Sequence, residues 1–332
     1  MSSQDFKELR VALTTKPGAT LYAALRHPNP SSSDSNPLAD TLVVFLNGLL
    51  LPSATWSETI SHLLSLRKTL NQPTPAILCY DRYGQGKSDP DPTDDLASDP
   101  DYGHGPLSSI ADLHQLLQQL SHDELHIPLE SLRLILVCNS IGCALARLYA
   151  ATYHTDSRIV AYVFLDSMMA NTDFVSIFPD PDKPEFDKRK LPKGVTPNDL
   201  RHARLKFRQY FHPDVPNAER LDRRALRDLL PLADGPALPQ GLGGSPPLLT
   251  VVGHDWEEFA EQCERGSLAV SKEVINAYMN PAWTKYNEGL IHLTTPPGEL
   301  KIAKDCGHFI QKDDPEFVAN EINDILNRIV AL

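Results

Sequence analysis

The chain has 332 residues with a formal charge of −12, and 41% of its residues are hydrophobic while 22% are charged. This composition supplies enough apolar side chains for a sizeable core and excludes a globally disordered chain. The length predicts one large α/β domain or a core domain with a smaller insertion. Because the acidic balance repels phosphates, we expect no nucleic-acid partner.

Neither a membrane span nor a secretory leader is expected. No stretch approaches the roughly 20 apolar residues that a spanning helix needs, and the polar start MSSQDFKELR lacks an apolar signal segment. The cysteines form no CxxC pair, which is typical of reduced thiols in an intracellular protein. They are Cys79, Cys138, Cys143, Cys263 and Cys306. We therefore expect a cytoplasmic protein with no membrane contact.

Strand-like and helix-like segments alternate along the chain. An antiparallel pair at 6–14 and 20–26 is followed by a loop rich in Ser, Asn and Pro at 28–36. The expected strands that follow are 41–46, 75–80, 132–138, 159–165, 248–252 and 300–303, and the expected helices are 54–69, 107–120, 141–153 and 314–331. This alternation predicts a mostly parallel sheet covered by helices on both faces, whose ligands bind at the carboxyl ends of the strands.

The composition changes within the chain. Residues 168–245 hold 13 basic and 11 acidic residues, many prolines and short helical patches, whereas the flanks hold the apolar runs. Such a shift is typical of an inserted subdomain. We expect a core domain made of residues 1–167 and 246–332, and a cap made of residues 168–245.

Two strand ends carry groups suited to acyl chemistry. The fifth strand runs into Cys138-Asn-Ser140-Ile-Gly142, so a sharp turn there would present the Ser140 hydroxyl beside the N–H groups of a helix start. His308 follows the last strand and would lie at the same edge of the sheet. A serine and a histidine so placed could form a nucleophile and its base, with an acid to orient the imidazole.

Four segments together resemble the α/β-hydrolase superfamily over roughly residues 20–332. They are the Asn47-Gly48 turn, DRYGQGKSD (81–89), the elbow at 138–142 and CGHFIQKDDPEFV (306–318). The resemblance implies an eight-stranded, mostly parallel sheet with helices on both faces and an inserted helical cap. It implies Ser140 as nucleophile, His308 as general base and acid, and the backbone N–H groups of Leu49 and Ile141 as the oxyanion hole.

The acid of the triad has two candidates. Asp166 follows the sixth strand, where a minority of relatives place it, and Asp255 follows the seventh, where most relatives have Gly-x-x-Asp. Trp256 occupies the usual acid position and Asp255 comes one residue early. Asp166 is the preferred candidate, with Asp255 as the alternative.

The resemblance implies a serine hydrolase acting on a carboxylic ester or lactone of a small, largely apolar molecule. Serine at the elbow points away from the haloalkane dehalogenases and epoxide hydrolases of this superfamily, which attack through a carboxylate. Acyl transfer, thioester hydrolysis or cyclisation by the same triad, or ligand binding without turnover, are the alternatives. No cofactor or metal is implied, and a monomer or homodimer is expected.

Other motifs favour structural roles. The GxG of the DRYGQGKSD stretch lacks a third glycine and does not enter a helix, so we interpret it as a turn. His122 and His126 have the spacing of a zinc pair but lie away from the catalytic edge, on an expected solvated helix end. The aspartate-rich run 89–101 is predicted to be a mobile acidic loop. The apolar groups of the cap are expected to form mainly its own core, and its Lys/Arg runs a solvated face.

Overall fold

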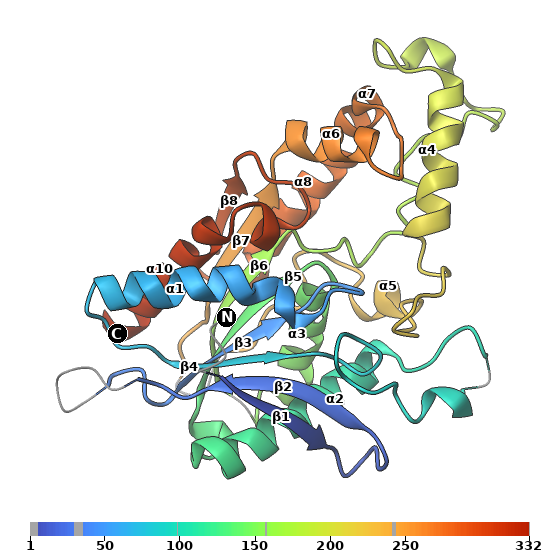
Figure 1. The fold of residues 1–332 in the computed structure, drawn as a ribbon. Coiled ribbons are helices and arrows are strands. Elements are labelled where there is room, and N and C mark those ends of the chain that lie inside the picture. Colours follow the sequence, from blue (N-terminus) through green and yellow to red (C-terminus); the bar gives the residue numbers. More distant parts are fainter. Residues whose placement is uncertain (1–5, 30–35, 98, 157, 241–243, 332) are drawn as a thin grey trace.

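A computed structural model describes residues 6–29, 36–97, 99–156, 158–240 and 244–331 (Figure 1). Most of the predicted loop 28–36 lies outside these residues. Eight strands form one sheet in the order β1-β2-β4-β3-β5-β6-β7-β8. The strands are β1 (Lys7–Ala12), β2 (Thr20–Arg26), β3 (Thr41–Leu46), β4 (Ala76–Tyr80), β5 (Arg133–Asn139), β6 (Arg158–Leu165), β7 (Leu248–His254) and β8 (Glu299–Ala303).

The strand directions follow the predicted pattern. The strand β2 pairs antiparallel with both β1 and β4, and the other strands pair in parallel. The strands β3 and β4 are buried along their whole length because both faces of the sheet are covered at the centre. The edge strand β1 instead alternates exposed and half-buried residues. The continuous apolar runs of the sequence are therefore the central strands.

Helices cover both faces of the sheet. On one face α1 (Ser57–Thr69) lies beside α10 (Pro315–Ala331), and on the other α2 (Pro106–Leu120) lies beside α3 (Ile141–Tyr153) (Figure 1). Each pair closes its own apolar core against the sheet, with Trp56 and Ile322 in one core and Leu113 and Tyr149 in the other. The fold is the α/β-hydrolase fold that the motifs predict.

Two long segments leave the sheet beyond its strand ends. The segment after β6 contains α4 (Pro197–Tyr210) and the short α5 (Leu226–Leu229). The segment after β7 contains α6 (Trp256–Arg265), α7 (Lys272–Val274) and α8 (Asn280–Leu290), followed after β8 by α9 (Ile310–Asp313). The two segments touch, because the Phe178 and Tyr278 rings lie 6.4 Å apart and Phe174 and Trp283 lie 6.1 Å apart. Both segments therefore build the structure above the catalytic edge (Figure 1).

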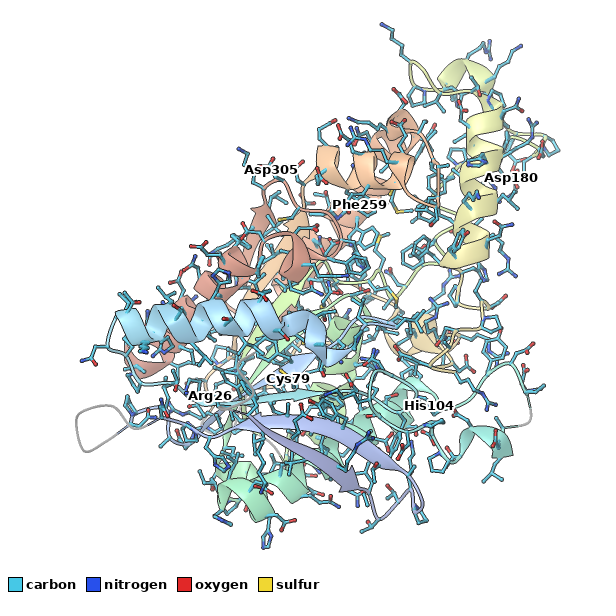
Figure 2. The ribbon with its side chains drawn as sticks, viewed as in Figure 1. Arg26, Cys79, His104, Asp180, Phe259 and Asp305 are labelled. Atoms are coloured by element: carbon cyan, nitrogen blue, oxygen red, sulfur yellow. The ribbon has the colours of Figure 1, made fainter. Side chains whose placement is uncertain are left out.

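All five cysteines are buried free thiols, in agreement with the reduced state expected from their spacing. Cys79 lies inside the sheet (Figure 2). Burial raises the pKa of the Cys263 thiol and of the Cys306 thiol to about 12. Protonated, buried thiols pack as small apolar groups.

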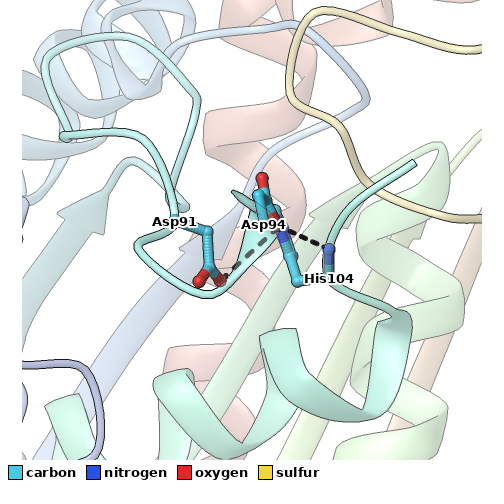
Figure 3. Close-up of side chains that lie close together, drawn as sticks. All are labelled: Asp91, Asp94 and His104. Atoms are coloured by element: carbon cyan, nitrogen blue, oxygen red, sulfur yellow. Dashed lines mark hydrogen bonds and ion pairs between the residues drawn. The ribbon is translucent and has the colours of Figure 1, made fainter. Parts of the chain in front are cut away.

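Two aspartates of the acidic run are buried, although its composition predicts a mobile loop. Asp91 and Asp94 are buried beside His104, whose Nδ1 lies 3.0 Å from Asp94 Oδ1 (Figure 3). The Lys16 ammonium contacts Asp91 and lies 2.6 Å from Asp112 Oδ2. A lysine distant in sequence thus supplies the positive charge that lets these carboxylates be buried.

The zinc-like pair also has a structural role. His122 is exposed and its Nδ1 lies 2.7 Å from Asp123, while His126 ends that helix with a left-handed backbone. Among the described residues, the group with the geometry to hold a metal ion is Asp91, Asp94 and His104, and the Lys16 ammonium already contacts it.

No helix of the described chain is long and apolar enough to span a membrane.

Candidate active site

Ser140 stands at a strained turn between β5 and α3. Its backbone has φ 56° and ψ −122°, a conformation that L-residues rarely adopt. Gly142 permits the turn, since a Cβ there would lie 2.4 Å from the carbonyl oxygen of Leu46. The helix α3 therefore begins close against β3, and the side chain of Ser140 is held at the strand end, as expected from the elbow motif.

The loop after β3 lies directly against Ser140. A Cβ placed on Gly48 would lie 3.4 Å from Ser140 Cβ, so glycine lets this loop approach the serine. Within the described residues, neither the Leu49 N–H nor the Ile141 N–H donates to another protein group. Two N–H groups without a protein acceptor thus belong to the two segments that meet at Ser140, and the oxyanion hole expected from them remains a prediction.

A buried polar cluster holds that loop in place. Arg82 donates to the carbonyl oxygens of Asn47 (2.7 Å) and Gly48 (3.0 Å), and Gln85 Nε2 also donates to Gly48 (2.9 Å). Asn47 in turn accepts from Trp56 Nε1 at 2.8 Å. The carbonyl of Gly48 is therefore fixed by two side-chain donors, and the Leu49 N–H of the same trans peptide unit points in the opposite direction.

The segment between β6 and β7 contributes a carboxylate to the same cluster. Glu219 is 1% exposed and forms a 3.0 Å ion pair with Arg82. Its Oε1 also accepts from Gln85 at 2.7 Å and from the Leu50 N–H. Gly84 makes this approach possible, because a Cβ there would lie 2.7 Å from the Glu219 carbonyl oxygen. The sequence analysis missed Glu219, which only the three-dimensional arrangement connects with the loop at 47–50.

His308 meets Asp166 at the edge of the sheet. The His308 Nδ1 lies 2.6 Å from Asp166 Oδ2, although the two residues are 142 positions apart in the sequence. Asp166 is fully buried and follows β6 with a left-handed backbone, φ 40°. Of the two predicted acids, Asp166 is the one whose carboxylate the structure brings to His308.

Asp166 is held in its ionised form. Burial alone would raise the pKa of this carboxyl group, but the charge of His254 and hydrogen bonds from His254 and His308 outweigh it, so the pKa lies below its usual range. Oxygen Oδ1 faces His254 Nδ1 at 2.8 Å, while Oδ2 faces His308. One carboxylate therefore binds two histidines. The sequence analysis did not identify His254, although it is the residue immediately before Asp255.

Asp255 caps a helix instead. Its Oδ1 accepts from the backbone N–H groups of Glu257 (2.9 Å) and Glu258 (3.5 Å) at the start of α6. Its Oδ2 accepts from the N–H of Asp305 at 3.3 Å. These bonds are those of an N-cap residue that also ties α6 to the loop before His308.

Ser140 and His308 lie in neighbouring segments without a direct hydrogen bond. Asn139, the residue before the serine, donates from Nδ2 to the backbone oxygen of His308 at 3.1 Å. Within the described residues, Ser140 Oγ makes no hydrogen bond to the imidazole. The bond between nucleophile and base is often long or absent in a free enzyme and forms in the substrate complex.

The aromatic residues of the segment between β6 and β7 pack mainly on one another. Phe178 and Phe207 are buried with ring centroids 4.9 Å apart, while Phe211 is 37% exposed. A cavity of about 460 Å³ lies between α4 and the loop 173–191. Neither Ser140 nor His308 lines it. Several arginines of this segment pair with nearby aspartates, for example Arg201 with Asp182 at 2.7 Å.

Comparison with known proteins agrees with this architecture. A sequence model of the alpha/beta hydrolase family matches residues 43–321, and the chain belongs to that family. No curated protein matches the sequence.

Solved structures show the same fold at low identity. Epoxide hydrolase VrEH1 from Vigna radiata has a TM-score of 0.51 and 14% identity, covering 99% of this chain and 100% of its own. A thermophilic esterase from Thermogutta terrifontis has a TM-score of 0.51 and 15% identity, covering 97% and 99%. Est1E from Butyrivibrio proteoclasticus, with ferulic acid bound, has a TM-score of 0.52 and 14% identity, covering 97% and 100%. The chain is therefore a hydrolase by family, within a fold that serves more than one chemistry.

Proposed function

We propose that the protein is a serine hydrolase that cleaves a carboxylic ester or lactone of a small, largely apolar molecule, using Ser140, His308 and Asp166. The observation that carries this proposal is the 2.6 Å contact between His308 Nδ1 and Asp166 Oδ2, at the edge where the strained Ser140 turn stands. That contact fixes the imidazole tautomer with Nε2 unprotonated, as a base for serine requires.

The reaction would proceed through an acyl-enzyme. His308 Nε2 takes the Ser140 hydroxyl proton as Oγ attacks the acyl carbon, and the Leu49 and Ile141 N–H groups donate to the oxyanion. The imidazolium then gives its proton to the leaving oxygen as the acyl–oxygen bond breaks. Water, deprotonated by His308, attacks the acyl-enzyme, releasing the acid and restoring Ser140.

The residue at the elbow separates this proposal from the chemistry of the epoxide hydrolases on the same fold. An alkyl-enzyme intermediate needs a carboxylate nucleophile at the turn, and this chain has the hydroxyl of Ser140 there. A hydroxyl activated by a histidine suits attack on an acyl carbon.

The cap over this site is proposed to be residues 168–245. Its segment at Glu219 reaches the loop of the oxyanion hole, so the cap would both cover the substrate and support the hole. The helices α6 and α8 close the other side, with the Trp283 ring 5.3 Å from the ring of His308.

The proposal is tested by rapid-mixing kinetics with p-nitrophenyl acetate. We expect an initial burst of p-nitrophenol stoichiometric with enzyme, followed by slower turnover. The burst and the turnover should both vanish in Ser140→Ala, while Ser61→Ala, at an exposed position of α1, should retain them. Turnover that persists in Ser140→Ala would refute the assignment of the nucleophile.

A further inference from the structure

His254 is a buried titratable group that the proposed reaction does not use. It ends β7, is 3% exposed, and packs against two aromatic rings. The Phe259 ring stacks on it with centroids 4.2 Å apart, and the Trp283 ring is nearly perpendicular to it with centroids 5.4 Å apart. Both ring nitrogens face oxygen atoms, Nδ1 towards Asp166 Oδ1 at 2.8 Å and Nε2 towards Asn280 Oδ1 at 3.0 Å.

The orientation of the Asn280 amide is fixed because its nitrogen contacts oxygen atoms that can only accept hydrogen bonds. Its Nδ2 donates to the carbonyl oxygen of Trp256 at 3.1 Å and to Asn276 Oδ1 at 2.6 Å. Asn276 is itself oriented, because its Nδ2 donates to the Glu257 carboxylate at 3.1 Å. Exchanging N and O in the Asn280 amide would place its oxygen against the Trp256 carbonyl, so Oδ1 must face His254.

The donor and acceptor roles in these hydrogen bonds determine the protonation state of His254. An amide oxygen accepts only, so Nε2 must carry a proton to bind Asn280. The Asp166 carboxylate likewise accepts from Nδ1, and its Oδ1 also faces the His254 backbone N–H at 3.4 Å. We propose that His254 is held at neutral pH as an imidazolium paired with Asp166, and that it acts as a positioning residue for the triad; this role rests on the function proposed above.

The charges around His254 agree with this state. The facing charged group is Asp166 of β6, with Asp255 adjacent on its own segment and His308 on the far side of Asp166, while α6 and α8 present the uncharged Phe259, Trp283 and Asn280. Burial alone would lower the pKa of His254, but the attraction of Asp166 outweighs it, with help from the Asn280 bond and Asp255. The pKa of His254 therefore lies above its ordinary value.

The consequence for catalysis is twofold. His254 holds Oδ1, so that Oδ2 is aimed at His308 Nδ1. It also balances the charge of Asp166, so the His308 imidazole faces a neutral ion pair instead of a lone carboxylate. Removing the charge of His254 would leave His308 facing a lone carboxylate, so the variant should differ from wild type in the pH dependence of the reaction.

The charge state is tested directly by NMR of the whole protein labelled with ¹⁵N-histidine. At pH 7 we expect both ring nitrogens of His254, assigned through its backbone, to carry protons and to show imidazolium shifts. A neutral tautomer with one unprotonated nitrogen at that pH would overturn the proposal. This readout needs neither a substrate nor a variant.

The effect on the triad is tested by the pH profile of kcat/KM with p-nitrophenyl acetate, in wild type and His254→Gln. Removing the charge should move the acid limb to higher pH by about one unit. The matched change His122→Gln, at an exposed histidine, should leave the limb in place. An unmoved limb, or one moved to lower pH, would refute the role of His254.

The two measurements also distinguish this inference from the proposed function. If wild type shows no turnover that depends on Ser140, the proposed function fails while NMR still decides the charge of His254. If turnover is present but the acid limb of His254→Gln does not move, the function stands and the positioning role fails. Should His254→Gln not fold, the NMR result alone decides.

Discussion

Asp166 and Asp255 follow neighbouring strands, and only the contacts of their side chains distinguish them. Asp166 accepts from the imidazoles of His308 and His254, whereas the oxygens of Asp255 accept from backbone N–H groups. The bonds to Asp166 orient two imidazoles and favour their charged form, whereas the bonds to Asp255 stabilise the start of a helix and a loop. We therefore expect different consequences when each carboxylate becomes an amide.

Asp166→Asn should lower kcat by about 10⁴-fold, because the amide stabilises the wrong tautomer of His308. Asp255→Asn should keep kcat near the wild-type value, since asparagine caps helices about as well as aspartate. Steady-state kinetics on the two matched variants tests this. Loss of activity in Asp255→Asn with retention in Asp166→Asn would reverse the assignment.

At the level of single residues, the sequence was a better guide to the candidate site residues than to the side chains that they contact. Ser140 and His308 are recognisable because each lies in a motif that follows a strand end, β5 for Ser140 and β8 for His308. The choice of Asp166 depends on a backbone with φ 40° that directs its side chain, which no local pattern reveals. His254 was missed because its significance depends on the β6–β7 register, in which Leu165 pairs with Val252.

At the level of structural elements, the loop after β3 is bound by side chains from two other segments. Arg82 and Gln85 come from the turn after β4, and Glu219 comes from the cap segment. Because all three side chains are buried, the position of the Leu49 N–H depends on the docking of the cap.

Glu219→Gln should lower kcat by about 10-fold to 100-fold with little change in KM, because a shifted oxyanion donor weakens binding of the transition state alone. The matched change Glu185→Gln, at an exposed site of the same cap, should have no effect. Steady-state kinetics of the two variants with p-nitrophenyl acetate tests this prediction. Equal behaviour of the two variants would show that the oxyanion loop holds its position without the cap.

The acidic run shows how a residue distant in sequence can stabilise buried carboxylates. Lys16 joins Asp91 and Asp112, and all three side chains are nearly inaccessible to solvent. Lys16→Met should lower the free energy of unfolding by about 3–5 kcal/mol, because it leaves buried carboxylates without a counter-charge.

Urea denaturation measures that loss. Lys7→Met, which removes a pair in which the lysine is largely exposed, should cost about 1 kcal/mol or less. Similar losses in the two variants would show that the buried cluster contributes no more than a surface pair.

For the whole molecule, periodicity and apolar runs predicted the strands and the sheet. They could not show that two separate segments build the structure above the active site. The contacts between Phe178 and Tyr278 and between Phe174 and Trp283 join residues about 100 positions apart, and such pairings are not encoded in local patterns. The same limit explains the acidic loop, whose burial depends on Lys16.

The stability of the molecule should depend on pH through His254. Its pKa is raised by folding, so its contribution is fully present below the unfolded value of about 6.5 and is lost as pH rises through the folded value. The difference in free energy of unfolding between wild type and His254→Gln should therefore shrink as pH rises above about 6.5. Urea titrations at several pH values test this, and a difference that grows with pH would contradict it.

The central claim is that Ser140 is a nucleophile activated by His308, and covalent labelling with a fluorophosphonate probe tests it most directly. We predict one label per chain on the peptide that contains Ser140, identified by mass spectrometry, with labelling abolished in Ser140→Ala and strongly slowed in His308→Ala. An unlabelled wild-type protein, or a label on another residue, would contradict the account.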